Sequence, residues 1–155
     1  MAYANHAPFL DGLPDPHHQS EFYAGVNAKR LLAWCIDMVL IGIVSIVILP
    51  FTAFTALFFF PVFFLFVGFL YRWFTLAGGS ATWGMRMMAI EFREADGGRL
   101  TNGTAFAHTL GYTISVGVAP LQLISVVLMV LTDRNQGLSD LVLGTAAINR
   151  PATRR

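Results

Sequence analysis

The sequence contains little charge and almost no cysteine. Aspartate, glutamate, lysine and arginine together make up 12% of its 155 residues, about half the fraction that is typical of a soluble domain. The net charge is only +1, and the charges are too scattered to indicate that the partner is a nucleic acid. The single cysteine, Cys35, excludes a disulfide bond within the chain and leaves the redox compartment unassigned.

Residue patterns that could hold a metal or a phosphate group are also lacking. His17 and His18 are adjacent, but no cysteine or carboxylate accompanies them at the spacing of a metal site. The glycine-rich stretch 78–86 lacks the G-x-x-x-x-G-K-[ST] pattern of a phosphate-binding loop. No Ser/His/Asp or Cys/His arrangement typical of nucleophilic catalysis is recognisable. We therefore expect no metal, no cofactor and no enzymatic activity.

Apolar residues, in contrast, are abundant. They make up 55% of the chain, and the mean hydropathy is +0.61. The charged residues lie mostly in the N-terminal tail, around 86–99 and after 132, which leaves three long stretches nearly free of charge. This distribution predicts an all-α membrane protein, a single helix bundle in contact with the lipid bilayer.

The two ends of the chain differ from this apolar centre. Residues 1–22 hold acidic and turn-forming residues and lack the basic start and apolar core of a signal peptide. We expect them to form a disordered tail. Residues 23–150 are then the membrane domain, and 151–155 are a short basic tail.

The first two apolar stretches predict a hairpin of two transmembrane helices. The first covers 28–49, and about 20 apolar residues suffice to cross a bilayer. Pro50 follows, as is common just after a helix. The second stretch, 54–75, begins so soon afterwards that the two helices must be antiparallel neighbours. Pro61 lies inside it, so we expect a kink there.

The loop between the second and third apolar stretches predicts a structure at the membrane interface. We expect a turn and a short helix in which Trp83 and Met85 enter the lipid and Arg86 lies at the headgroups. Residues 89–93 alternate in a way that predicts a short strand, with 100–101 as its hairpin partner.

The third apolar stretch, 103–132, is too long for one crossing, because as a helix it would measure about 45 Å. Either 104–115 lies at the interface and 116–132 spans the membrane, or the chain breaks near 117–120 and re-enters. The basic residues that flank the first helix place the N-terminus in the cytoplasm. The basic C-terminal tail stays on that side only if the third segment re-enters, so we favour the second arrangement.

Asp37 is a carboxylate inside the first apolar stretch. Such a group costs about 2.5–3.5 kcal/mol at the centre of a membrane helix, so we expect a functional or a structural ion pair. Arg30, two helical turns earlier, lies on nearly the same face, roughly 10 Å away along the axis. Asp140 follows Ser139 at the start of a short helix, where it caps the helix or pairs with Arg30 or Arg86. We favour the ion pair.

Four motifs occur in order along residues 23–150. They are Arg30-Leu-Leu-Ala-Trp-Cys-Ile-Asp37, then Gly79-Ser-Ala-Thr-Trp-Gly84-Met-Arg86, then Ile90 to Asp96-Gly97-Gly98, and finally Leu138-Ser-Asp140-Leu-Val-Leu-Gly-Thr145. Together they resemble the RDD family of small bacterial membrane proteins. Arg30, Asp37 and Asp140 take the places of the arginine and two aspartates for which that family is named. One departure is His108, near which the family often carries an arginine.

The resemblance implies a multi-pass protein of the bacterial cytoplasmic (inner) membrane, in a family whose activity is mostly unassigned. Transport, including sodium–proton exchange, has been proposed for the family. Our first hypothesis is therefore ion or small-solute transport, with Arg30, Asp37, Asp140 and Arg86 as candidate site residues. Three short segments make a poor pathway, so transport favours a homo-oligomer or a larger membrane complex. The alternative is a structural or accessory subunit, in which a cluster of Arg30, Asp37 and Asp140 fixes the packing of the helices.

Overall fold

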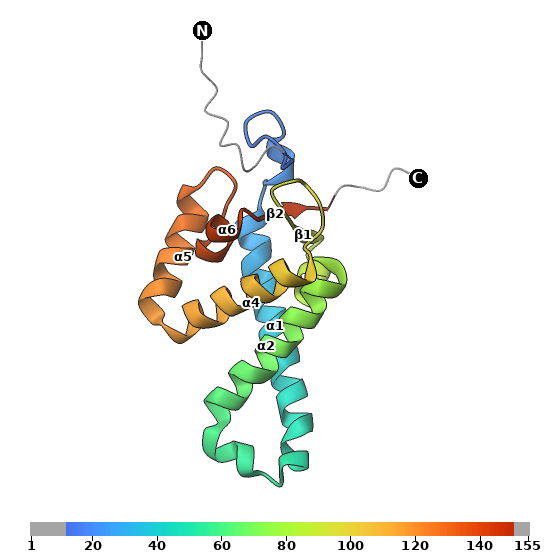
Figure 1. The fold of residues 1–155 in the computed structure, drawn as a ribbon, viewed down its shortest axis with the longest axis vertical. Helices are drawn as coiled ribbons and strands as arrows, with labels where there is room; N and C mark the ends of the chain where they lie inside the picture. The colour runs from blue at the N-terminus through green and yellow to red at the C-terminus, as the bar shows by residue number, and fades with distance from the viewer. Residues whose placement is uncertain (1–11, 151–155) are drawn as a thin grey trace.

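Two long helices form the hairpin that the sequence predicts. In the computed structural model, which describes residues 12–150, helix α1 covers Val26–Ile48 and helix α2 covers Phe60–Gly79. Each belongs to a segment that is long and apolar enough to cross a membrane. Figure 1 shows them running together along the long axis of the molecule, joined at the bottom of the view.

The connection between α1 and α2 is longer than expected. Two 3-10 helices, Leu49–Thr52 and Thr55–Phe59, fill it. Between them the chain reverses at Ala53 and Phe54, which have φ angles of 49° and 60°. The expected kink at Pro61 is wrong, because this proline lies in the first turn of α2. A missing N–H removes no intrahelical hydrogen bond at that position.

The third apolar stretch is broken, as predicted. Helix α4 covers Asn102–Gly117, helix α5 covers Ala119–Leu131, and the two are bent by 117°. Val118 has an extended backbone at the break, and Pro120 follows in the first turn of α5. Figure 1 shows the resulting V beside the upper half of the hairpin.

A small sheet lies at the upper end of the hairpin in Figure 1. Strand β1, Ile90–Arg93, pairs antiparallel with strand β2, Ala146–Asn149. The predicted pairing with residues 100–101 is therefore wrong. The Leu100 N–H binds the Ser80 hydroxyl at 2.8 Å instead, which holds the chain after the turn against the end of α2.

Helix α3, Trp83–Met87, lies between α2 and the sheet in the sequence and packs against α1. Trp83 is exposed, but Met85 is buried in the core. The expectation that Met85 enters the lipid is wrong, because its side chain is packed in the core of the protein. The largest core cluster contains Met85 together with Val26, Leu76, Ile90 and Phe92.

Residues 12–22 differ from the expected disordered tail. They form turns and a 3-10 helix, Ser20–Phe22, and the Gly12 N–H binds the Ala95 carbonyl at 2.9 Å. Leu13 is buried in a small cluster with Tyr23 and Ile148 of β2. The rest of the expected tail, 1–11, and the expected basic tail, 151–155, lie outside the described residues.

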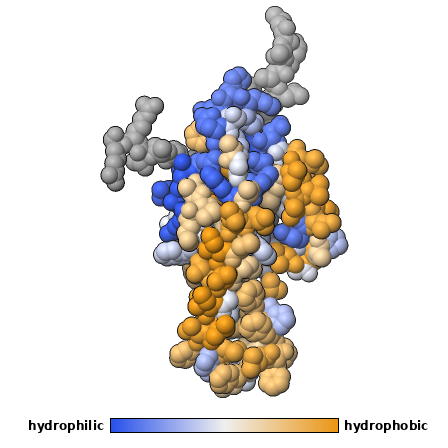
Figure 2. Space-filling view, turned by 180° about the vertical axis from the view of Figure 1, so that it is seen from behind, coloured by the Kyte–Doolittle hydropathy of each residue, from blue (hydrophilic) through white to orange (hydrophobic). Residues whose placement is uncertain are grey.

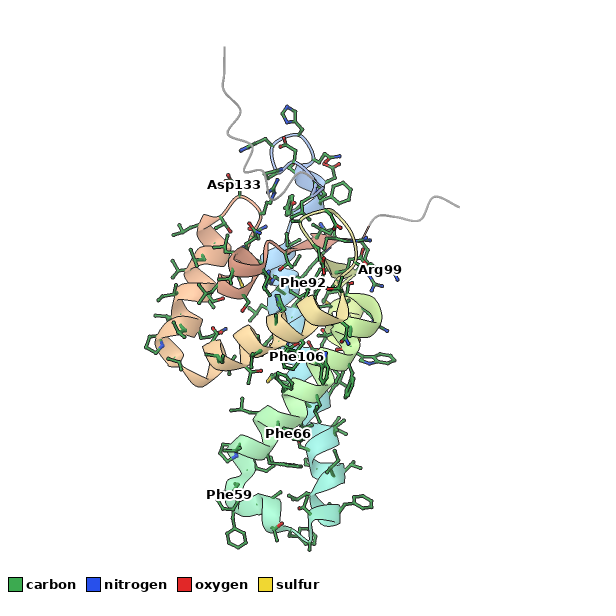
Figure 3. All side chains as sticks on the ribbon, viewed as in Figure 1. Phe59, Phe66, Phe92, Arg99, Phe106 and Asp133 are labelled. Atoms are coloured by element: carbon green, nitrogen blue, oxygen red, sulfur yellow. The ribbon has the colours of Figure 1, made fainter. Side chains whose placement is uncertain are left out.

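Hydrophilic and apolar surfaces are separated along the long axis of the hairpin. Figure 2 shows the hydrophilic surface at the end that carries the sheet and the apolar surface over the rest of the hairpin. Helix α5, beside the hydrophilic end, also has an exposed apolar surface. Phe59 and Phe66 belong to that apolar end, and both are exposed (Figure 3). An apolar surface of this length is suited to lipid, and the hydrophilic end to water.

Candidate functional site

Asp37 of α1 is 1% exposed and accepts hydrogen bonds at both carboxylate oxygens. Its Oδ1 accepts from the Tyr71 hydroxyl at 2.7 Å and from the Gly84 N–H at 2.9 Å. Its Oδ2 accepts from the Thr82 hydroxyl at 2.7 Å. The carboxylate therefore joins α1 to α2 and to the start of α3.

The residues before and in α3 are suited to this contact. Thr82 is the N-cap of α3, and its hydroxyl accepts a hydrogen bond from the Met85 N–H at 3.2 Å. A Cβ atom on Gly84 would lie 2.2 Å from the Ala33 carbonyl oxygen and 2.8 Å from Oδ1 of Asp37. Only glycine allows the backbone of α3 to approach α1 this closely.

Arg72 of α2 is the cation nearest to Asp37. Its Nη2 lies 3.8 Å from Oδ2 of Asp37, with the arginine side chain 12% exposed. The guanidinium stacks on the ring of Tyr112 from α4, 4.1 Å from the ring centroid. Both Nε and Nη2 are buried and make no hydrogen bond within residues 12–150. Arg72 is thus attracted to Asp37 without being hydrogen-bonded to it.

Asp140 forms a second charged centre, in the short helix α6, Leu138–Leu143. Its Oδ2 lies 2.7 Å from Nη1 of Arg30 and accepts from the Gly137 N–H at 2.9 Å. Its Oδ1 lies 2.7 Å from Nε2 of His108 and 3.3 Å from the Thr145 hydroxyl. Asp140 therefore joins the start of α1 to α4 and caps its own helix.

These partners also affect the protonation of Asp140. Burial alone raises the pKa of its carboxyl group, but the Arg30 charge and the hydrogen bond with His108 oppose that effect. Together with the charge of His108 and the Gly137 N–H, they hold the pKa below its ordinary value. Asp140 thus remains ionised at neutral pH.

A cavity of about 490 Å³ lies between the helices and includes groups from both centres in its wall. Asp37, Arg72, Arg30, Asp140 and His108 all line it. Most of the remaining wall is apolar. The ring of Phe92, labelled in Figure 3, lies beside the same groups, 4.4 Å from the His108 ring and 5.2 Å from the Arg30 guanidinium.

The chain matches the model of the RDD family over residues 23–144. The chain belongs to the RDD family. A comparison with curated proteins and another with solved structures each give no match. Within this RDD protein, the predicted name-giving residues Arg30, Asp37 and Asp140 are all placed at the cavity.

The expected arrangement of these residues is nonetheless wrong in one respect. Arg30 and Asp37 form no ion pair among the described residues, so the predicted single cluster is two separate centres, Arg30–Asp140 and Asp37–Arg72. Asp140 both caps its helix and pairs with Arg30, so the two alternatives for it are combined. Arg86 belongs to neither centre; its Nε donates to the Ala81 carbonyl at 3.3 Å.

Several site residues of this RDD protein were not predicted. Arg72 and His108 both line the cavity, and His108 contacts Asp140, 32 residues later in the sequence. Both could have been identified from the sequence, because each is a polar residue within an apolar stretch. Such residues in membrane helices are candidates for a functional role. No group of three or more metal-ligating side chains occurs in residues 12–150.

Proposed function

We propose that this RDD protein transports ions or small solutes, with the cavity as the substrate site. The observation that carries the proposal is the charged wall of a cavity of about 490 Å³ within a domain of apolar helices. A bundle that needed Arg30, Asp37, Arg72 and Asp140 only for packing would bury them without leaving such a space, because protein interiors are closely packed.

The break between α4 and α5 supports the same proposal. An interrupted helix is tolerated at membrane depth where it lines a cavity or is buried in protein, and transporters commonly place substrates at such breaks. Ser115 and Gln122 lie on either side of this break and are hydrogen-bonded to each other at 2.9 Å. Both side chains line the cavity.

Cation–proton exchange at Asp37 is one specific form of the proposal. A cation would approach this carboxylate from the cavity, but its oxygens already accept three hydrogen bonds. Two of the donors, Thr82 and Gly84, belong to the start of α3. Exchange at Asp37 therefore requires α3 to move away from α1.

A structural or accessory role is the second candidate. It is favoured by the complete hydrogen bonding of both carboxylates, since Asp37 and Asp140 each join α1 to two other elements. In this role the ion pairs fix the positions of the helices in a larger membrane complex or a homo-oligomer. Neither role assigns an enzymatic activity to the chain.

For the orientation, we propose the bacterial cytoplasmic membrane, with the hydrophilic end in the cytoplasm. The start of α1, strand β1 and the loop after α5 lie at that end of the fold (Figure 1). These segments carry Lys29, Arg30, Arg93 and Arg134, and the basic residues of bacterial membrane proteins are concentrated on the cytoplasmic side.

The test is a flux measurement in liposomes that contain a trapped pH dye. Gradients of sodium, potassium and lithium are imposed in turn on the wild type and on Asp37→Asn and Tyr71→Phe. Tyr71→Phe removes one hydrogen bond to Asp37 and keeps the carboxylate. Arg86→Gln is the matched control, because Arg86 does not line the cavity.

Transport at Asp37 predicts a cation-dependent pH change in the wild type and Arg86→Gln, an altered rate in Tyr71→Phe and no change in Asp37→Asn. A folded wild-type protein that gives no response with any cation would exclude cation–proton exchange. In that case the second candidate would be favoured, and co-purification would be used to find the partner complex.

A further inference from the structure

Arg72 has the largest unused hydrogen-bonding capacity in the cavity wall. Its guanidinium forms no hydrogen bond within residues 12–150, and two of its nitrogens, Nε and Nη2, are buried without a partner. Its ion pair with Asp37, at 3.8 Å, is longer than a hydrogen bond. The third nitrogen, Nη1, likewise makes no hydrogen bond within residues 12–150, and it is not one of the fully buried atoms, so it is the donor that a ligand in the cavity can reach.

The two carboxylates of the cavity, in contrast, are already occupied. Both oxygens of Asp37 accept hydrogen bonds, as do both oxygens of Asp140. A cation would have to displace these donors, whereas an anion would meet Nη1 of Arg72, which makes no hydrogen bond within residues 12–150. The wall is therefore better prepared for an anion than for a cation.

Tyr112 holds the Arg72 guanidinium in place for such a ligand. The guanidinium carbon lies 4.1 Å from the centroid of the Tyr112 ring, so one face of the group is covered. The N–H donors lie at its edge, and this planar edge matches the two oxygens of a carboxylate or a phosphate. The Tyr112 hydroxyl is itself fixed, because it accepts from the Trp34 indole at 2.8 Å.

The rest of the wall indicates an apolar body for the same ligand. Leu31, Trp34, Val126, Met129 and Val130 all line the cavity. The volume of about 490 Å³ lies within the range of roughly 300–1,000 Å³ that is typical of small-molecule sites. A small inorganic anion would leave most of this apolar surface uncovered.

We propose that the cavity binds an amphipathic anion, a carboxylate or phosphate on an apolar body, with its charged group held by Arg72. The ligand occupies the site of the proposed function, but its binding does not depend on transport. Two sources share this chemistry: a monocarboxylate from the aqueous phase and an anionic lipid from the bilayer.

The test is calorimetric titration of the purified full-length protein, in a neutral detergent, with hexanoate. Hexylammonium is the matched probe of opposite charge. We expect hexanoate to bind and hexylammonium to bind at least tenfold more weakly. Arg72→Gln should weaken hexanoate binding by about tenfold to a hundredfold, as is typical when a charged hydrogen bond is lost. Arg72→Lys keeps the positive charge but not the planar guanidinium, so it should reduce the affinity for hexanoate less than Arg72→Gln does.

Arg86→Gln is the control, and its affinity for hexanoate should equal that of the wild type. Far-UV circular dichroism establishes that each variant is folded, and Arg72→Lys provides the comparison if Arg72→Gln does not fold. The proposal is overturned if folded wild-type protein does not bind hexanoate, if hexylammonium binds equally well, or if a folded Arg72 variant keeps the full affinity.

Whether the natural ligand is a lipid or an aqueous solute is tested by repeating the hexanoate titration in nanodiscs of phosphatidylcholine, with or without phosphatidylglycerol. Weaker hexanoate binding in the presence of phosphatidylglycerol assigns the site to a lipid, and unchanged hexanoate binding assigns it to an aqueous solute.

The test of the anion site and the test of the proposed function can fail independently. Hexanoate binding without cation-dependent flux contradicts only cation–proton exchange, and such flux without hexanoate binding contradicts only the anion site.

Discussion

The separation of the charged groups into two centres predicts which pairs of substitutions are energetically coupled. Arg30→Gln leaves Asp140 without its cation in a site that is 1% exposed. Removing one partner of a buried ion pair typically destabilises a protein by about 3–5 kcal/mol. Asp140→Asn leaves Arg30 without its anion, so it should destabilise the protein by a similar amount.

The double variant Arg30→Gln/Asp140→Asn should be more stable than the sum of the two single effects indicates. Direct partners typically show a coupling of about 0.5–3 kcal/mol. Arg30→Gln/Asp37→Asn should instead be additive to within about 0.3–0.5 kcal/mol, as for groups that share no partner. The unfolding free energies can be measured in detergent micelles by circular dichroism as sodium dodecyl sulfate is added. Coupling between Arg30 and Asp37, or additivity between Arg30 and Asp140, would refute the assignment of the pairs.

Three further predictions concern the packing, the acid stability and the topology. Gly84→Ala should destabilise the protein by about 1–3 kcal/mol, as is typical of overpacking, in the same unfolding assay. The control Gly78→Ala should leave the stability unchanged, because no atom lies within 4 Å of the Cβ that it adds. Because the pKa of Asp140 is lowered in the folded protein, its ionised form stabilises the fold at any pH above the ordinary aspartate pKa of about 3.9. This contribution to stability should be lost progressively as the pH falls below that value. Asp140→Asn should lack this component in an acid titration followed by circular dichroism. The topology can be tested with single cysteines in a variant that lacks Cys35. Asp133→Cys should react with an impermeant thiol reagent from the cytoplasmic side, and Thr55→Cys should react from the opposite side. Labelling of both positions from the same side would contradict the proposed topology.

The sequence predicts the parts of this fold that depend on local spacing. The hairpin follows from two apolar stretches of membrane-spanning length, and the break in the third stretch follows from its excess length and from Pro120. The apolar setting of Asp37 marks it as a buried polar residue, and the structure buries it. Each of these predictions depends on residues within one segment.

The partners of the buried groups could not be predicted in this way. Arg30 and Asp37 share a helical face, but two turns of helix separate them by roughly 10 Å, and each finds a nearer partner on another element. Thr82 lies 45 residues from Asp37 in the sequence, and His108 lies 32 residues from Asp140. Such contacts depend on how helices are packed, which residue spacing does not encode. The pairing of β1 with β2, instead of with 100–101, has the same cause.

The partners of α1 also have a consequence for the order of events during synthesis. Asp37 meets Tyr71 and Thr82, which are translated 34 and 45 residues later. Asp140 is translated 110 residues after its partner Arg30. At a synthesis rate of about 5–20 residues per second, this delay is roughly 6–22 s. During that interval the first helix carries an arginine without its carboxylate. The hairpin and the hydrogen bonds of Asp37 can therefore form during translation. The ion pair of Arg30 with Asp140 can form only after the last part of the chain has been synthesised.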